Sequence, residues 1–388
     1  MTLGTCPFAV GVHELDALHE QLRTSGDGVH QAELLDGSPV WVITGYENVR
    51  RFLADSNVSA AKADSTTGFR GNKLPPALDA NLLNLDGEAH RRIRKLAAEA
   101  FAPPRQAAQR QVVTDIVAEL VGELPASGDI DLMGGVCEPL PVRVTGTLLG
   151  LRPDQLGAFR EASSPLLRAD SSHEPEALRN SMLTLWGLIS AAIADKRSRP
   201  GTDLLSDWIA ARDGADRLTE DELVSLAFIT IIGGFENTIS LAALVLDDLV
   251  RNHQDRARES LDTPAEFAAL IRELIRTAAP MNYAIRRFPL TDIEINGVTI
   301  PRGHTVLASI RSAHLDPASD NRPALVFGHG RHYCLGAPLA EMQTIEAARA
   351  LLTRYPHLEA NAPRETYRLR DSWMTYSLAE LTLKADRA

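Results

Sequence analysis

The segment FGHGRHYCLGAP, residues 327–338, gathers side chains that bind metals between closely spaced glycines. It holds His329, His332 and Cys334, and the chain has only three cysteines. Three interpretations are open: a glycine-rich turn around a core cysteine, a zinc site, or a haem iron held by a single thiolate. Zinc usually takes four protein ligands, or three and a water, and no fourth ligand is apparent in this segment.

The surroundings of Cys334 favour a thiolate. The cysteine precedes a helix expected over 337–353, whose first turn carries Pro338. The positive start of a helix stabilises a thiolate relative to a thiol. Gly330 and Gly336 allow backbone N–H groups to approach the sulfur, where they would tune the potential of a bound iron. The haem-thiolate interpretation therefore explains more residues than the other two.

The residues from Phe327 to Gly336 resemble the haem-binding signature of the cytochrome P450 family, with its usual fixed positions filled. The resemblance implies a haem b (iron protoporphyrin IX) cofactor with Cys334 as the axial iron ligand. It also implies that His332 contacts a haem propionate and that Phe327, Gly328 and Gly336 belong to the cofactor-binding loop.

Further propionate ligands are implied upstream. His90 and Arg94 lie one turn apart on a helix expected over 86–101, which by itself indicates only a solvated basic face. The P450 family has a similar HxxxR pair that binds the propionates, and arginine suits carboxylates because it donates in a bidentate geometry. Arg287 stands where the family places another propionate arginine. Its neighbour Arg286 is the less favoured choice.

Glu273 and Arg276 resemble the ExxR pair of the family, which has a structural role. The two residues are three positions apart on an expected helix, so an ion pair between them is predicted. Such a pattern alone means little, because surface helices are rich in it. Its position before the hairpin and the cysteine loop gives it weight.

The segment 232–238 resembles the oxygen-binding segment of the family. Gly233 and Gly234 lack side chains, so oxygen and substrate can approach the backbone, and they weaken the helix locally. Glu236 stands in an otherwise apolar helix, where a carboxylate costs free energy unless it is paired or functional. We interpret it as part of a proton-delivery path; the alternative is a glutamate that reaches a polar partner.

Several positions depart from the family pattern. The family normally has a threonine directly after the acid, whereas this chain has Asn237 followed by Thr238. Asparagine holds a water but relays a proton less simply than an alcohol does. Oxygen activation would then use a substrate group, an ordered water or Thr238, or the reaction would be an oxidative coupling or ring closure without net oxygen insertion. The segment before the cysteine loop is also shortened, with Arg322 as the obvious stand-in for its arginine, and Glu341 occupies a position where arginine is common.

Substrate contacts are expected from the 63–85 loop, the 163–190 region, the long helix and the segments after Pro280 and near the C-terminus. For each candidate, ordinary packing is the alternative. The candidates are Leu83, Phe235, Asn237, Asn282, Tyr283, Trp373 and Met374.

Composition limits the class of protein. The 388 residues are 44% hydrophobic and 23% charged, which is typical of a soluble globular chain. The net charge of −11 argues against a nucleic-acid or anionic-membrane partner. The few, widely spaced cysteines and the absence of a signal-peptide pattern indicate the cytoplasm. The apolar stretch 223–246 is interrupted by glycines and polar residues, so we expect a buried core helix and no membrane span.

The expected fold is mainly α with a small β part. Residues 39–54 predict a strand, a turn and a helix, and Thr219 with Glu222 predicts a capping box before the long helix. The alternating segment 291–310 with its Asn296-Gly297 turn predicts a small hairpin sheet. We expect a single P450-like domain over 1–388, with the haem buried between the long distal helix and the proximal cysteine loop.

The resemblance implies a haem-thiolate monooxygenase that oxidises a small organic substrate, free or carrier-bound, in natural-product tailoring. No nicotinamide or flavin motif is found, so the electrons would come from a separate ferredoxin or flavodoxin, docking near Arg331, Lys95 and Arg110. Two other classes stay open besides coupling: a peroxide-driven haem enzyme, and a haem sensor or carrier without turnover.

Overall fold

The computed structural model describes residues 7–9, 12–69, 75–167, 175–213, 218–320, 322–370 and 372–385. The chain is 59% helical with a small sheet part, which confirms the predicted fold class. Its contacts divide it into two compact units. The first comprises Met1–Arg94, Ala279–Cys334 and Asp371–Tyr376, and the second Lys95–Ala278, Leu335–Arg370 and Ser377–Ala388. That the two form a single domain stays a prediction.

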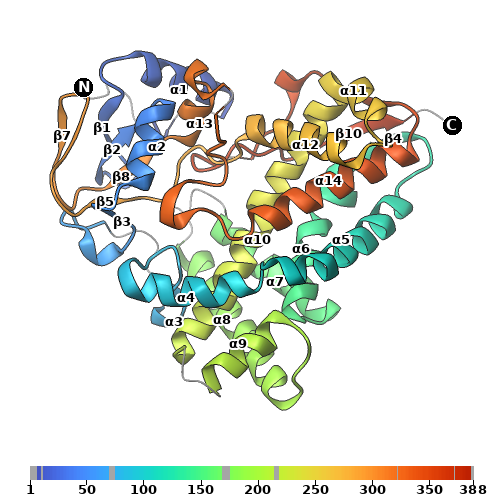
Figure 1. Cartoon of the computed structure of the whole chain (residues 1–388), viewed down its shortest axis with the longest axis horizontal. Coiled ribbons are helices and arrows are strands. Elements are labelled where there is room, and N and C mark those ends of the chain that lie inside the picture. The colour runs from blue at the N-terminus through green and yellow to red at the C-terminus, as the bar shows by residue number, and fades with distance from the viewer. Residues whose placement is uncertain are drawn as a thin grey trace. The chain divides into compact units, whose positions relative to one another are not determined.

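The first unit contains the strands β1, β2, β3 and β5 to β8 (Figure 1). β1 (Val29–Glu33) pairs antiparallel with β2 (Pro39–Ile43), and β2 pairs parallel with β8 (Val306–Ala308). β3 (Val58–Ser59) pairs with β5 (Phe288–Pro289). β6 (Ile293–Ile295) and β7 (Val298–Ile300) form the predicted hairpin, and Asn296 and Gly297 take the positive φ angles of 51° and 81° that its turn requires.

The helices of the first unit are short. α2 follows β2 as predicted, and it buries Tyr46, Val49 and Phe52 because their spacing places them on one helix face. They pack into a core that includes Ile43 and Val306 from the sheet. The helices are α1 (Leu15–Thr24), α2 (Tyr46–Ala54), α3 (Pro76–Asp79), α13 (Ile310–His314) and the start of α4 (Gly87–Glu99).

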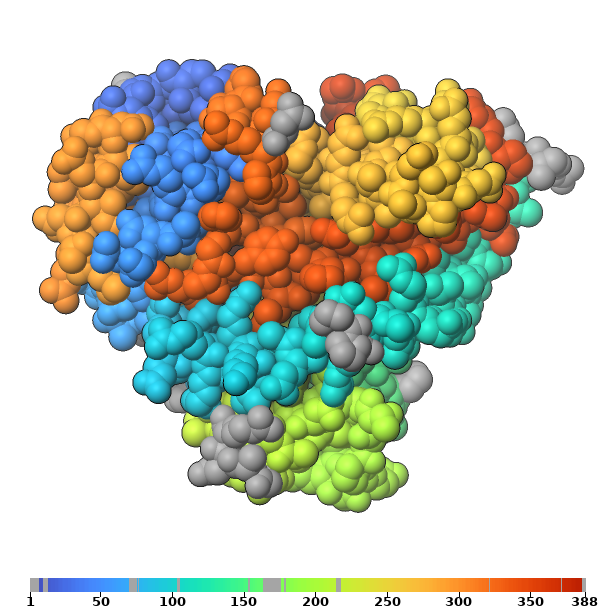
Figure 2. All heavy atoms as spheres, viewed as in Figure 1, coloured from blue at the N-terminus to red at the C-terminus, as the bar shows by residue number. Residues whose placement is uncertain are grey.

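The second unit is a helical assembly with one small sheet of order β4-β10-β9. Within it, α14 and α5 lie side by side (Figures 1 and 2). Its helices are α5 (Pro103–Glu123), α6 (Pro139–Leu149), α7 (Pro153–Leu167), α8 (Pro175–Ser198), α9 (Leu204–Asp213), α10 (Glu220–Asp248), α11 (Gln254–Glu259), α12 (Pro264–Ala278) and α14 (Ala337–Arg354). Its strands are β4 (Gly128–Asp131), β9 (Leu358–Ala360) and β10 (Thr382–Ala385).

α10 is the long helix of the second unit and begins with the predicted capping box. The Thr219 hydroxyl accepts the Glu222 N–H at 3.1 Å, and the Glu222 carboxylate accepts the Thr219 N–H at 2.8 Å. Among the described residues, only the helical stretch Glu220–Glu259 is long and apolar enough to cross a membrane. Most of its apolar window is buried within the protein, as expected of a core helix.

Candidate active site

The cysteine loop belongs to the first unit as far as Cys334. The Cys334 N–H donates to the Phe327 carbonyl at 2.9 Å, which closes the loop, and the thiol side chain is exposed. Gly330 has a φ of 72°, and a Cβ there would lie 2.5 Å from the Leu53 carbonyl oxygen, so the turn requires glycine. α14 starts at Ala337 with Pro338 in its first turn, as predicted. Gly336 is the residue before the helix.

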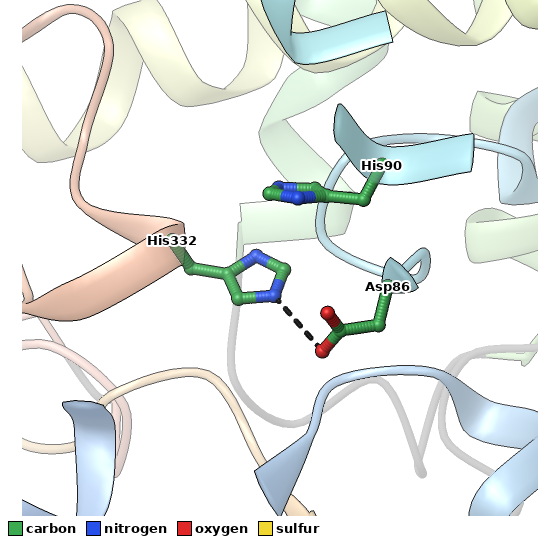
Figure 3. Close-up of side chains that lie close together, drawn as sticks. All are labelled: Asp86, His90 and His332. Carbon is green, nitrogen blue, oxygen red and sulfur yellow. Dashed lines mark hydrogen bonds and ion pairs between the residues drawn. The ribbon is translucent and has the colours of Figure 1, made fainter. Parts of the chain in front are cut away.

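Four of the predicted propionate ligands lie in the first unit around this loop. The rings of His90 and His332 are 4.2 Å apart (Figure 3). Arg94 donates to the Tyr333 carbonyl at 2.6 Å, beside Cys334. The Arg287 guanidinium is buried, and within the described part of the chain it donates only to the carbonyls of Ile285 and Arg286, at 2.7 and 3.2 Å.

Asp86 is the residue of this cluster that the sequence did not single out. Its carboxylate accepts hydrogen bonds from the backbone N–H groups of Ala60 and Gly87 and from Arg331, at 3.0, 2.9 and 3.1 Å. His332 Nε2 lies 3.4 Å from the same carboxylate (Figure 3). Burial alone would raise the pKa of Asp86, but these hydrogen bonds outweigh it and lower that pKa. Asp86 is therefore ionised and saturated with donors.

The cluster fits a dianion. His90 is buried, and its Nε2 has no hydrogen-bond partner among the residues that the structure describes. Burial lowers the pKa of His90 to about 4 and that of Arg287 to about 10, because both charged forms lose water and the charge of Asp86 offsets only part of that loss. Buried donors normally have partners. The two carboxylates of a haem would supply acceptors for His90, Arg94 and Arg287.

The second unit holds the predicted oxygen-binding segment on α10, which runs unbroken through both glycines. A Cβ at Gly234 would lie 2.7 Å from Thr145 Oγ1 of α6, so close helix packing requires glycine there. A Cβ at Gly233 would meet no atom within 4 Å. Only Gly233 thus borders the open space that an approaching ligand needs. Asn237 is half-buried and Thr238 is buried.

Glu236 is 8% exposed, and no hydrogen bond to its carboxylate is found among the described residues. Burial raises its pKa to about 7, opposed by the positive charge of Arg370. Arg370 is held by Glu138, with 2.8 Å between Nη2 and the carboxylate oxygen. Glu236 therefore gains and loses its proton near neutral pH, which suits a group that supplies protons.

The charged pairs around the ExxR segment differ from the expectation. Glu273 of α12 pairs with Arg256 at 3.1 Å, and no ion pair joins it to Arg276 in the part of the chain that the structure describes. Its side chain stays 47% exposed, so a surface arginine competes for it. The unusual Glu341 pairs with Arg272 at 3.0 Å.

Arg322, the expected stand-in for the arginine of the shortened segment, pairs with Glu47 at 2.9 Å in the first unit. Among the residues proposed for electron-carrier docking, Arg331 is bound to Asp86 and Arg110 pairs with Glu346 at 2.6 Å. Lys95 is exposed.

The predicted substrate residues fall into different environments. Tyr283 is fully buried and packs against the rings of Phe8, His19 and Trp373. Asn282 is also fully buried, and its Nδ2 donates to the Trp373 carbonyl at 3.0 Å. The other candidates are partly or fully buried: Leu83, Trp373 and Met374 in the first unit, and Phe235 and Asn237 in the second. Residues 70–74 and 168–174 of the expected substrate regions lie outside the described residues.

Comparisons with known proteins agree with this geometry. A family model described as Cytochrome P450 matches residues 188–324. The chain is 33% identical to the cytochrome P450 monooxygenase PikC of Streptomyces venezuelae, over 88% of this chain and 83% of PikC. The tirandamycin C-bound P450 monooxygenase TamI has a TM-score of 0.86 at 32% identity, over 96% of this chain and 97% of TamI. CxnD, a cytochrome P450 described as an enzyme for C–S bond formation in chuangxinmycin biosynthesis, has a TM-score of 0.84 at 27% identity, over 97% of this chain and 94% of CxnD. The chain therefore belongs to the cytochrome P450 family of haem b oxidoreductases.

Proposed function

We propose that this protein is a haem-thiolate monooxygenase that oxidises a small organic compound in natural-product tailoring. The observation that carries the proposal is that His90 and Arg287, two buried donors beside the cysteine loop, have no hydrogen bond to a carboxylate among the described residues. A surface cluster of the same residues would be solvated or neutralised by acidic side chains. A monooxygenase, a sensor and a carrier all need a haem, but an acid with a pKa of about 7 on the oxygen-binding segment favours turnover.

The residues have separate tasks in this proposal. Cys334 would hold the iron through its sulfur, with Phe327, Gly328 and Gly336 shaping the loop around it. His90, Arg94, Arg287 and His332 would bind the propionates. When bound, the haem supplies the activation of dioxygen, and the thiolate increases the electron density on the iron.

Glu236 would hold a proton at its carboxyl group and release it toward the oxygen-binding segment. The next residue, Asn237, orients a water through its amide, and Thr238 is the nearest hydroxyl in the segment. Gly233 leaves space for the ligand beside the helix, since nothing lies within 4 Å of a Cβ there. These roles make the proton supply depend on a water where the family pattern has an alcohol.

The substrate would be a small natural product, free or bound to a carrier protein, in the cytoplasm. TamI, a P450 with a similar fold, is described with bound tirandamycin C. A ferredoxin or flavodoxin would supply the electrons, and the exposed Lys95 is the docking candidate that has no described ion pair. Leu83, Phe235, Asn282, Tyr283, Trp373 and Met374 remain candidates for shaping the substrate pocket, directly or through packing.

A second function is oxidative coupling without net oxygen insertion. The presence of Asn237 in place of the usual alcohol favours it, because protonation of bound oxygen is then less direct. CxnD, a P450 of similar fold, is described as forming a C–S bond. Turnover under ¹⁸O₂ separates the two functions, because insertion labels the product and coupling does not.

The first test is the absorption spectrum of the purified ferric protein and of its reduced carbon monoxide complex. We expect a thiolate-type spectrum that is lost in Cys334→Ala. The matched control is Cys137→Ala, since Cys137 is buried and burial raises the pKa of its thiol. A spectrum shift with one class in a panel of macrolactones, terpenoids, cyclic dipeptides and aromatic amino-acid derivatives would identify the substrate class. A protein that cannot be loaded with haem would refute the proposal.

A further inference from the structure

Arg286 is a cation whose contacts differ from those of its neighbour Arg287. Its Nη1 donates to the Leu83 carbonyl at 3.1 Å, and its Nη2 donates to the Asn84 side-chain oxygen. The guanidinium carbon lies 5.7 Å from the centre of the Phe69 ring. Its Nε is buried, and no described residue accepts a hydrogen bond from it. Arg286 therefore reaches from the segment before β5 to the irregular segment between α3 and α4.

The segment that Arg286 holds is fixed at its other end by a chain of polar contacts. Asn84 Nδ2 donates to the Asp79 carboxylate at 2.8 Å and to the Asp79 carbonyl at 3.0 Å. Lys62 pairs with the same carboxylate at 2.6 Å. The Leu83 N–H donates to the Asn81 side-chain oxygen at 3.0 Å. Residues 79–84 thus lack regular structure beyond Asp79 but are anchored at both ends.

The type of contact indicates a positioning role. A guanidinium that holds a backbone carbonyl and a side-chain amide fixes two acceptors at a set separation, which the single ammonium of a lysine cannot do. No carboxylate among the described residues contacts Arg286 directly, and burial lowers its pKa to about 10 while Asp79 opposes this from a distance. Burying Arg286 costs the hydration free energy that an exposed arginine would keep. The hydrogen bonds that Arg286 makes to the anchored segment offset this cost.

We propose that Arg286 is a specificity-determining positioning residue that fixes residues 83–84 and thereby the place of Leu83 beside the substrate. The proposal rests on the proposed function, because Leu83 is a substrate contact only if the chain binds a haem and a substrate there. It assigns Arg286 to the substrate side and leaves propionate binding to Arg287.

Two probes and one exchange measurement test the proposal on the haem-loaded full chain. Imidazole is small, whereas 4-phenylimidazole must fit a ring into the substrate space, and both bind haem iron with a spectral shift. In Arg286→Met we expect the dissociation constant of 4-phenylimidazole to change about tenfold and that of imidazole to change less than about twofold. Amide hydrogen exchange over residues 79–86 should become about tenfold faster in the same variant.

Matched variants make the result specific. Arg51→Met removes an exposed arginine of the same unit and should change nothing. Asn84→Ala removes one of the two acceptors of Arg286 and also the contacts of Asn84 with Asp79, so it should change the ratio of the two azole affinities in the same direction as Arg286→Met. Arg286→Lys should recover only part of the wild-type behaviour.

Three results would each overturn the proposal: unchanged exchange over 79–86, an unchanged ratio of the two azole affinities, or haem loss from Arg286→Met as fast as from Arg287→Met. The last would place Arg286 in the cofactor site. A wild-type chain that binds no haem would refute the proposed function instead, so the two failures are distinguishable.

Discussion

Replacing Glu236 by glutamine removes a carboxyl group whose pKa rises from 4.5 to about 7 on folding. The cause is burial: the side chain is 8% exposed, and Arg370 offsets only part of the lost hydration. A rise of this size corresponds to about 3 kcal/mol of unfavourable free energy when the group is ionised. Glutamine has the same shape and no charge, so Glu236→Gln should be free of this cost.

The sign of the pH dependence follows from proton binding. Because the pKa of Glu236 is higher in the folded state, the folded protein binds more protons than the unfolded chain between pH 4.5 and about 7. The contribution to stability is fully present below pH 4.5 and is lost as the pH rises through about 7. Glu236→Gln should therefore equal the wild type at pH 4.5 and exceed its stability by up to about 3 kcal/mol at pH 8.

Infrared difference spectroscopy measures the same quantity without unfolding the protein. The band of the protonated carboxyl group, taken as wild type minus Glu236→Gln, should disappear with a midpoint near pH 7 in the haem-loaded enzyme. Glu266→Gln, which alters an exposed carboxylate of α12, is the control and should leave the difference band unchanged. A carboxyl group that is already ionised at pH 5.5 would show that Glu236 is solvated, and would refute the reasoning.

The same variant tests the role in turnover. Glutamine cannot release a proton, so product formed per electron consumed should fall by about 10²-fold or more if Glu236 supplies protons. If the product formed per electron is unchanged in Glu236→Gln while the infrared midpoint lies near pH 7, Glu236 has the raised pKa but does not supply the protons.

Three further predictions concern other charged groups. Asp86→Asn removes the carboxylate that holds Arg331 and His332. Transfer of haem from this variant to apomyoglobin should be at least about tenfold faster than from the wild type. An unchanged transfer rate would contradict the positioning role of Asp86. Burial lowers the pKa of His19 from 6.5 to about 3. The contribution of His19 to stability is therefore full above pH 6.5 and is lost as the pH falls below that value. His19→Gln should flatten the acid side of the profile of stability against pH, and an unaltered slope would exclude His19 as the cause of that slope. The Arg272–Glu341 pair is half-exposed, so a double-mutant cycle should give a coupling free energy of about 0.5 kcal/mol or less. The reversed pair, Arg272→Glu with Glu341→Arg, should restore that coupling. A coupling free energy of several kcal/mol would instead show that the pair belongs to a buried network.

The sequence predicted the local features of this protein well. The capping box at Thr219, the turn at Asn296 and the start of α14 after Cys334 depend on residues within a few positions of one another. These features depend on short-range interactions along the chain, so they can be predicted from a single sequence. The loop around Cys334, closed by the Cys334 N–H and the Phe327 carbonyl, is also one contiguous segment, whereas the role of Cys334 as haem ligand stays a prediction.

Contacts between distant segments were not predictable in this way. Asp86 meets Arg331 across 245 positions, and nothing in either local pattern indicates the other. Helical spacing predicted that Glu273 would pair with Arg276, yet Arg256 takes the carboxylate, because an exposed side chain pairs with whichever cation the tertiary fold brings near. The sequence likewise did not show why position 234 needs a glycine, because the atom that a Cβ there would meet belongs to Thr145 of another helix.

The charge imbalance in each unit is the strongest argument that these residues are functional. In the first unit, the single carboxylate of the cluster, Asp86, is saturated with donors, while the buried His90 and Arg287 have no hydrogen bond to an acid among the described residues. In the second unit, Glu236 is a buried acid, and no described residue gives it a hydrogen-bonded cation. A fold selected only for stability would pair such groups or replace them with apolar residues, because each costs free energy as it stands. The imbalances have opposite signs and match what a haem enzyme needs: cations for two propionates and an acid that can release a proton.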